Sequence, residues 1–219
     1  MNEELCFGQR YDSELGILEP WYTNPCMDEI KTWDLSDKVV LEYGGGASSW
    51  WWAYRCKKVV TIESNPEWFS KIAEQAKEHD CQMWGSLTKY KEPIVLIQNK
   101  DRTIDLTIIL KQINEGDQVR GMEYVEAYYE EPMFGVIKPD IVVVDGIMRT
   151  ECCQAAVDLL SVKGGVCICD NWHQDYVWIS PKAEEIMYKH TTQIYSQPNH
   201  TNFENEGCEW KTAIFKIIA

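Results

Sequence analysis

Short apolar runs alternate along this chain with apolar stripes at helical spacing. Val39–Leu41 is the first such run and leads into a glycine turn, and Val59–Ile62 is the second and ends in Glu63. Apolar runs of this length, bounded by glycine or polar residues, are typical of buried strands. The stretch Trp68–Ala76 carries apolar residues at a 3.6-residue period. Residues 38–79 are therefore predicted to form a strand–glycine turn–helix–strand–helix unit.

The two helices of this unit have recognisable starts. Ser48 or Ser49 suits an N-cap after the glycines, because a serine hydroxyl can accept a hydrogen bond from the first turn. Asn65 is predicted to cap the second helix, with Pro66 as its first residue.

A second unit of the same kind follows. Ile141–Val144 is an apolar run that ends in Asp145, and Val166–Cys169 is another that ends in Asp170 and Asn171. Between these runs lies an apolar stripe at helical spacing, so a strand–helix–strand arrangement is predicted.

The middle and the end of the chain are less regular. Ile94–Ile97 and Ile104–Leu110 are candidate strands, and we expect one of them to be the third strand of the sheet and the other to add a hairpin. Gln118–Glu130 is a candidate helix. Thr192–Tyr195 and Thr212–Ile218 are predicted to close the chain as an antiparallel pair.

Strands that alternate with helices predict an α/β fold with right-handed crossovers. We expect a Rossmann-like, mostly parallel seven-stranded sheet with an antiparallel C-terminal strand and helices on both faces. No linker rich in Gly, Ser or Pro divides the chain, so residues 1–219 are expected to form a single domain with an N-terminal extension at 1–37.

Composition narrows the classes of partner. The formal net charge is −14, from 35 acidic and 21 basic residues, and the longest basic run is Lys57-Lys58. Nucleic-acid binding needs clustered positive charge, so no nucleic-acid partner is predicted. No apolar run reaches the 18 residues of a membrane span, so no membrane partner is predicted either. Nine cysteines without a CxxC pair predict reduced thiols in a cytoplasmic protein rather than a structural zinc site.

The ends of the predicted strands carry the candidate chemistry. In a parallel α/β sheet, ligands bind beyond the carboxyl ends of the strands. That edge collects Glu42–Gly46, Glu63, Asp145, Asp170 and Asn171. Four strand ends that carry acidic or glycine residues are a stronger signal than any one of them, so the site is predicted at the carboxyl ends of the strands.

The glycine turn indicates an adenosine cofactor. Gly44–Gly46 permits close backbone approach, and the following helix start presents free N–H groups. Such a turn suits the carboxylate of a methionine moiety or a phosphate equally well. Glu63, at the end of the next strand, can accept both hydroxyls of a ribose. A dinucleotide fingerprint needs Gly or Ala where Ser49 stands, and Glu42 would repel a pyrophosphate, so an NAD(P)-type site is disfavoured.

These residues carry a family resemblance. The segment KVVLEYGGGASSWWWAYRCKKVVTIESNPEWFSKI resembles the first half of class I S-adenosyl-L-methionine (SAM)-dependent methyltransferases, in which a strand ends in E/D-x-G-x-G. A bacterial and phage group within that superfamily also resembles this chain at Trp21–Thr23 and in the segment DIVVVDGIMRTECCQAAVDLLSVKGGVCICDN. The resemblance covers roughly residues 18–80 and 120–178.

The resemblance implies the class I methyltransferase fold and SAM as the cofactor. The extension at 1–37 is expected to pack on the cofactor side, where Trp21 and Tyr22 either cover the cofactor or form a hydrophobic plug. The resemblance also implies that Glu42, Gly44 and Gly46 line SAM and that Glu63 binds its ribose. The full set of expected cofactor-binding residues is Glu42, Tyr43, Gly44, Gly45, Gly46, Ser48, Glu63, Ser64 and Asp145.

A second resemblance concerns metal binding. Asp145 with the Asp170-Asn171 pair resembles the magnesium site of catechol O-methyltransferase-like enzymes, whose oxygen ligands suit Mg²⁺. The lysine base expected three residues after Asp145 is missing, because Met148 stands there. Two interpretations stay open: Mg²⁺ bound at these three residues, or no metal, with Asp145 contacting cofactor or substrate.

Four residues are the candidates for catalysis. His173 is the candidate general base, because histidine titrates near neutral pH. Asp145, Asp170 and Asn171 are the other three. Arg149 stays protonated and is no base; it either binds an anionic substrate group or pairs with an acid at a strand end.

The sequence therefore predicts methyl transfer from SAM to a small-molecule or glycan acceptor. The alternatives are a non-catalytic SAM- or nucleotide-binding protein, an NAD(P)-type oxidoreductase, and an enzyme that consumes SAM without an acceptor. Acceptor choice is expected to depend on the segments 98–120 and 172–210, and the oligomeric state stays open.

Overall fold

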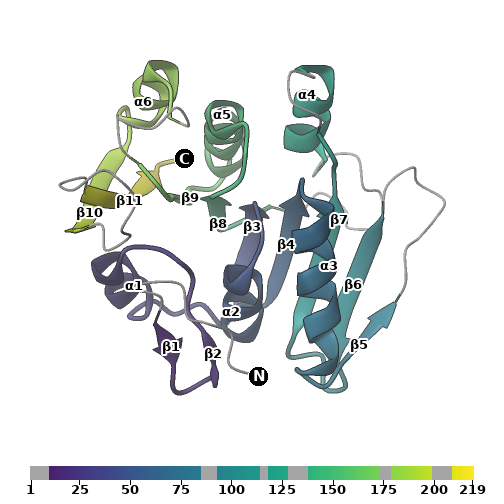
Figure 1. Cartoon of the computed structure of the whole chain (residues 1–219). Coiled ribbons are helices and arrows are strands. Elements are labelled where there is room, and N and C mark those ends of the chain that lie inside the picture. The colour runs from purple at the N-terminus through teal and green to yellow at the C-terminus, as the bar shows by residue number, and fades with distance from the viewer. Residues whose placement is uncertain (1–9, 85–92, 114–117, 128–137, 173–178, 199–208) are drawn as a thin grey trace.

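The computed structural model describes residues 10–84, 93–113, 118–127, 138–172, 179–198 and 209–219. A twisted sheet of nine strands runs through this part of the chain (Figure 1). From one edge to the other, the strands are β10 (Thr191–Pro198), β11 (Glu209–Ile217), β9 (Gly165–Cys169), β8 (Ile141–Val144), β3 (Val39–Tyr43), β4 (Lys58–Glu63), β7 (Asp105–Leu110), β6 (Ile94–Asn99) and β5 (Cys81–Trp84).

The five central strands, from β9 to β7, pair in parallel. The C-terminal strand β11 pairs antiparallel with both β9 and β10. This order confirms the predicted Rossmann-like, mostly parallel α/β fold with an antiparallel C-terminal strand, but the sheet has nine strands in the described residues where seven were predicted. The hairpin of β5 and β6 adds two antiparallel strands beside β7; a hairpin was predicted in this stretch, but strand β5 was not.

Helices cover both faces of the sheet, as predicted (Figure 1). On one face lie α1 (Asn24–Ile30), α2 (Ala47–Arg55) and α3 (Pro66–Glu74), which the short 3₁₀ helix η1 (Gln75–Lys77) continues. On the other lie α4 (Gln118–Glu126), α5 (Arg149–Leu160) and α6 (Pro181–Met187). In β3, the side chain of Val40 packs on the face covered by α1, α2 and α3, whereas Leu41 and Tyr43 pack on the face covered by α4, α5 and α6. A strand buried on both faces explains the unbroken apolar run in the sequence.

Three consecutive tryptophans of α2 belong to the core rather than to a binding pocket. Trp50, Trp51 and Trp52 are all buried. Their indole N–H groups donate to the carbonyl oxygen of Ile72 (3.1 Å), to Asp12 Oδ2 (2.9 Å) and to Tyr22 Oη (3.3 Å), respectively. Because each buried N–H has an acceptor, the ring burial carries no desolvation penalty at the nitrogen.

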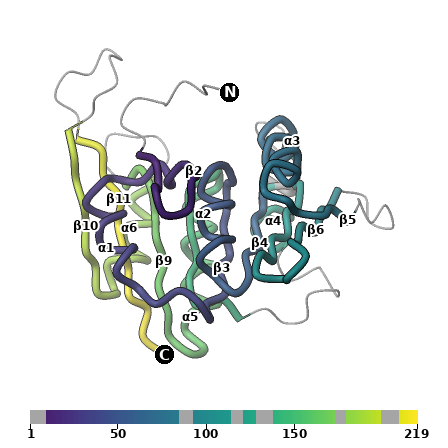
Figure 2. The backbone as a smooth tube through the Cα atoms, turned by 90° about the horizontal axis from the view of Figure 1, so that it is seen from below, coloured from purple at the N-terminus to yellow at the C-terminus, as the bar shows by residue number. Residues whose placement is uncertain are grey.

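The N-terminal segment packs on the face of α2. Its hairpin of β1 (Tyr11–Asp12) and β2 (Ile17–Leu18) lies beside α2, and α1 lies beside β10 (Figure 2). The backbone N–H of Thr23 donates to Thr212 Oγ1 at 2.9 Å and so ties this segment to β11. In the described part of the chain, no helix has both the length and the apolar character that crossing a membrane requires.

Candidate functional site

The glycine turn between β3 and α2 is fixed by its neighbours on both sides. The N–H of Gly44 donates to the carbonyl of Ile62 on β4 (2.9 Å), and the N–H of Gly146 after β8 donates to the carbonyl of Tyr43 (2.7 Å). Gly44 has a φ of +85°, and a Cβ there would lie 2.5 Å from the Cα of Gly146. Only glycine fits this left-handed position and this close backbone contact.

The start of α2 differs from the sequence prediction. The N-cap is Gly46, and neither Ser48 nor Ser49 takes that position. The hydroxyl of Ser49 instead accepts from the N–H of Gly46 (3.2 Å) and donates to Glu42 Oε2 (2.6 Å). Local sequence could not reveal this role of Ser49, because it depends on a contact with Glu42 on the other side of the turn.

Glu42 is a fully buried carboxylate beneath this turn. Its Oε2 accepts from the hydroxyls of Ser49 (2.6 Å) and Thr61 (2.8 Å), whereas its Oε1 has no hydrogen-bond partner within the described residues. Burial raises the pKa of Glu42 from its usual value near 4.5 to about 7, although the hydroxyls of Ser48, Ser49 and Thr61 act in the opposite direction. Glu42 is therefore a titrating group in the pH range of normal assays.

This titration gives a testable pH dependence of stability. Because the folded-state pKa of Glu42 lies above its unfolded value, the folded protein binds the proton more tightly, and stability falls as pH rises from about 4.5 to about 7. The expected loss is on the order of 3 kcal/mol, and above pH 7 it stays constant. Urea unfolding of the wild type and of Glu42→Gln across pH 5–8 measures it. Equal slopes for the two proteins would show that Glu42 is not the group responsible.

Glu63 ties the end of β4 to the glycine turn. Its Oε2 accepts from the N–H of Gly45 (2.7 Å), and its Oε1 accepts from the N–H groups of Ser64 and Asn65 (both 2.7 Å). A carboxylate offers about four acceptor positions, so these three contacts leave one for a ligand hydroxyl rather than the two that both ribose hydroxyls would need. Glu63 therefore also holds the glycine turn in place, a role that the sequence did not indicate.

Arg149 joins the ends of β8 and β9. Its buried guanidinium donates to the carbonyls of Asp145 (2.9 Å) and Gly146 (2.9 Å), to the carbonyl of Asp170, and to Asn171 Oδ1 (3.1 Å). It also pairs with Asp145 Oδ1 at 3.4 Å. Of the two interpretations drawn from sequence, the structure therefore supports the structural ion pair at a strand end.

The same contacts remove the support for Mg²⁺. The side-chain oxygens of Asp145 and Asn171, which a metal would need, face a fixed positive charge on Arg149. Asp170 Oδ1 is engaged by the hydroxyl of Thr212 (2.7 Å). Among the residues that the structure describes, no group of three or more His, Cys, Asp or Glu side chains could hold a metal ion.

Asp145 and Asp170 are neighbouring carboxylates with unequal exposure. The side chain of Asp145 is 29% exposed, whereas Asp170 is buried. Burial raises the pKa of both groups, and the proximity of Asp145 raises that of Asp170 further. Arg149 lowers both pKa values and so offsets part of this effect. Asp145 is the carboxylate that a ligand can reach.

The remaining predicted site residues lie at the same edge, with different roles. Tyr43 points into the core, where its hydroxyl donates to the carbonyl of Val125 (3.0 Å), so only its backbone borders the turn. Ser48 is buried in the first turn of α2, and Ser64 follows Glu63 at the start of the next loop. His173, the predicted general base, lies outside the described residues.

Two further residues reach this site from distant segments. Tyr22 is buried close to Glu42, Asp145 and Asp170, and burial together with these carboxylates raises the pKa of its phenol. Thr212 links Asp170 to the backbone of Thr23. The resemblance at Trp21–Thr23 was the one sequence signal for Tyr22; nothing in the sequence pointed to Thr212.

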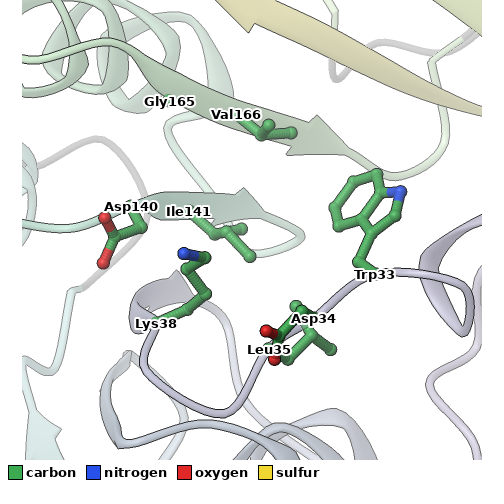
Figure 3. A pocket seen from close by; sticks show the side chains of 8 residues that line it. All are labelled: Trp33, Asp34, Leu35, Lys38, Asp140, Ile141, Gly165 and Val166. Carbon is green, nitrogen blue, oxygen red and sulfur yellow. The ribbon is translucent and has the colours of Figure 1, made fainter.

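A cavity of about 280 Å³ lies away from the glycine turn, at the amino ends of the parallel strands (Figure 3). It is bordered by the segment before β3 and by the first residues of β8 and β9, and Trp33, Leu35 and Lys38 project into it (Figure 3). The carboxylate of Asp140 at its border is already held by the backbone N–H of Val39 (2.9 Å) and by Lys163 (2.7 Å). None of the candidate cofactor residues lines this cavity.

Comparison with solved structures identifies the fold. The chain is similar to a methyltransferase-like protein from Silicibacter pomeroyi, with a TM-score of 0.57 and 16% identity, over 90% of this chain and 88% of that one. It is also similar to the N-methyltransferase NodS from Bradyrhizobium japonicum WM9, with a TM-score of 0.54 and 13% identity, over 90% of this chain and 99% of that one. The chain has the class I methyltransferase fold. The resemblance drawn from the sequence is thus confirmed at the level of fold. No family model matches the sequence, and a search of the curated proteins finds no match either.

One prediction from composition has to be corrected. The matching structures include one described as a putative rRNA methylase from Clostridium thermocellum (12% identity, TM-score 0.44) and one described as a putative tRNA (m1A22) methyltransferase from Streptococcus pneumoniae (8%, 0.47). The prediction that nucleic acid is no partner was wrong as an exclusion, because the overall charge on which it rested does not exclude such a partner. A net charge of −14 describes the whole chain, whereas RNA is bound by local groups of basic residues.

Proposed function

We propose that this protein binds SAM at the carboxyl edge of β3, β4 and β8 and transfers its methyl group to an acceptor. The observation that carries the proposal is the geometry around Glu63, whose carboxylate both fixes the glycine turn through Gly45 and keeps an acceptor position for a ribose hydroxyl. The methyltransferase fold supports it further. Because one fold serves many activities, the argument rests on the residues of the site.

The residues present fit this cofactor. The side of Gly46 that a side chain would take is open, with the nearest atom, Trp68 Cζ3, 4.0 Å from the ideal Cβ position. Beside it begins α2, whose first N–H groups favour a carboxylate. Asp145 presents a partly exposed carboxylate on the other side of the turn, suited to an ammonium group. Glu63 is the proposed ribose ligand.

Within this proposal, SAM supplies a sulfonium methyl group that reacts by in-line displacement. The chain then contributes orientation and exclusion of water. Glu63 and the turn fix the nucleoside, Arg149 holds Asp145 in position, and the segment of Tyr22 and Thr23 borders the site from the N-terminal side. Asp145 has a raised pKa and a partly exposed side chain, and we assign it the contact with cofactor or acceptor.

The local structure around Ser49 argues against the NAD(P) alternative. A dinucleotide turn has Gly or Ala at this position so that the helix packs closely against the strand. Here the Ser49 hydroxyl is committed to Glu42, and the acid lies directly beneath the turn. Anionic phosphates would meet this carboxylate at close range, whereas a cationic amino acid moiety would not be repelled.

The proposal includes a cytoplasmic setting. The cysteines of the described segments are all free, and Cys152, Cys153, Cys167 and Cys169 lie buried near one another without a disulfide. Free buried thiols are typical of a reducing compartment.

Replacing Glu63 tests the cofactor assignment. Glu63→Ala is expected to weaken binding of SAM and of S-adenosylhomocysteine by about 1–3 kcal/mol, because ribose loses an acceptor and the turn loses its anchor. Titration calorimetry with both ligands and with NAD measures this. Glu67→Ala, on the exposed first turn of α3, is the matched control and should bind as the wild type does. Tight binding of NAD, without binding of SAM or S-adenosylhomocysteine, would contradict the proposal.

An acceptor screen separates catalysis from binding alone. The wild type is incubated with radiolabelled SAM and with pools of small molecules, glycans, tRNA and rRNA, and both methylated product and S-adenosylhomocysteine are measured. Methyl transfer to any pool supports the enzyme. Binding of SAM without either product would support a non-catalytic SAM-binding protein, and S-adenosylhomocysteine formed together with methanol, without methylated acceptor, would indicate transfer of the methyl group to water.

A further inference from the structure

The cavity at the amino ends of the parallel strands is large enough for a small ligand. Its volume is about 280 Å³, whereas a cavity of about 150 Å³ with aliphatic walls is sufficient to take up benzene. The additional space corresponds to a second ring or a short polar group. The cavity lies at the starts of β8 and β9, and the glycine turn faces the other ends of the same sheet. A ligand in this cavity would therefore not compete with one at the turn.

Most of the cavity lining is apolar. Leu35 and Ile141 are 5% and 3% exposed, and they border the cavity together with Val166 (Figure 3). The ring of Trp33 forms a further wall, and its orientation is fixed because its Nε1–H donates to Glu29 Oε1 at 3.1 Å. A fixed indole beside aliphatic side chains favours an aromatic ligand, which buries apolar surface and can pack against the ring.

Lys38 brings a positive charge to this apolar lining. Within the segments that the structure describes, its ammonium has no ion pair, because the two carboxylates of the lining have other partners. Asp140 Oδ1 lies 2.7 Å from Lys163 Nζ. Asp34 Oδ1 accepts from the hydroxyl of Ser36 at 2.8 Å and from its N–H at 3.2 Å. The ammonium of Lys38 is therefore available to an anionic group of a ligand.

The charges around the cavity also limit the charge of that ligand. Lys163 offsets the charge of Asp140, which leaves Lys38 and Asp34 as the groups whose charge no side chain of the described residues neutralises. Lys38 can balance one negative charge. A second charge on the ligand would lie near Asp34 and Asp140 without a positive partner of its own, on a chain whose net charge is already −14. A carboxylate fits this site better than a phosphate dianion does.

We propose that this cavity is a second ligand site, which binds a small aromatic monocarboxylate. The aromatic ring of the ligand packs against Trp33 and the aliphatic floor, and its carboxylate pairs with Lys38. The proposal goes beyond the proposed function and does not depend on it, because no residue assigned to SAM lines the cavity.

Two probes of equal size test the site: 1-naphthoate, a two-ring carboxylate, and 1-naphthamide, which is uncharged. The protein is labelled with 5-fluorotryptophan and titrated with each probe by fluorine NMR, and the signal that is missing from Trp33→Phe belongs to Trp33. 1-Naphthoate is expected to shift this signal. The signal of Trp84, which is identified in the same way and is 48% exposed on the edge strand β5, should not move. 1-Naphthamide is expected to bind about fivefold more weakly, because it lacks the charge.

A substitution of Lys38 tests the charge. Lys38→Met keeps an apolar chain, so it should weaken binding of 1-naphthoate about fivefold and leave binding of 1-naphthamide unchanged. Lys189→Met is the matched control, because Lys189 is 67% exposed and does not line the cavity. It should bind both probes as the wild type does. Thermal unfolding without probe shows that each variant is folded.

Three results would overturn the proposal. The first is a Trp33 signal that does not move at millimolar 1-naphthoate. The second is an equal shift of the Trp33 and Trp84 signals, which would indicate unspecific adsorption of the probe. The third is equal affinity of the wild type for the two probes, or equal weakening of both in Lys38→Met, because Lys38 would then not recognise the carboxylate.

Discussion

Replacing Arg149 by methionine is expected to lower the free energy of unfolding by about 3–5 kcal/mol. The side chain is buried, and its loss leaves the carbonyls of Asp145, Gly146 and Asp170 and the side chain of Asn171 without their donor. It also leaves two neighbouring carboxylates without their positive partner. Methionine keeps an unbranched apolar chain but lacks the guanidinium, so the effect combines the loss of the polar contacts with the space that the guanidinium leaves. Urea unfolding at pH 7 measures it.

An exposed cation provides the matched control for Arg149. Lys189 is 67% exposed and lies 4.0 Å from Glu185 on the same side of the molecule as α6. Lys189→Met should change the free energy of unfolding by less than about 1 kcal/mol, because exposed pairs contribute little. A loss of similar size in both variants would mean that the buried network contributes no more than a surface ion pair.

The second large effect is expected from Gly44→Ala. The residue has a φ of +85°, and its new Cβ would lie 2.5 Å from both the Cα and the N of Gly146. The strained backbone and the backbone clash together should cost about 3 kcal/mol or more. Relief of the clash would separate β3 from the loop after β8, so SAM affinity is expected to fall as well. Urea unfolding and titration calorimetry measure the two effects.

Gly46→Ala is the control for that substitution. Gly46 has an extended φ of 173°, and the atom nearest to its ideal Cβ position is 4.0 Å away. The expected change in unfolding free energy is below about 1 kcal/mol. Equal losses for Gly44→Ala and Gly46→Ala would show that the contact with Gly146 is not what requires glycine at position 44.

The strand ends were predictable because their chemistry is local. Glu63 follows an apolar run directly, and Asp145 and Asp170 do so in the second unit. In a parallel sheet the carboxyl ends of all the strands lie on the same side, so residues that follow different strands in the sequence become neighbours in space. Asn65 and Pro66 could be predicted as a helix start for the same reason, since capping acts between residues two positions apart.

The role of Arg149 could not be predicted from the sequence. The sequence offered two partners for its guanidinium, an anionic ligand or a carboxylate of the protein, and local context favours neither strongly. The choice depends on Asn171 and the carbonyl of Asp170, which lie 22 and 21 residues away. The magnesium hypothesis depended on the same choice, because Arg149 faces the oxygens that a metal would need.

By itself, the sequence of this protein predicted the strand–helix units around β3, β4, β8 and β9 and the glycine turn between β3 and α2, and it placed the candidate site at the carboxyl ends of these strands. These follow from periodicity and from residues close in the chain. The tertiary structure alone decided that Ser49 serves Glu42 rather than the helix end, that Gly44 must be glycine because Gly146 lies against it, and that Trp68 stands exposed beside the turn. Each of these depends on a contact between segments brought together only by folding, and such contacts leave no periodic trace in the sequence.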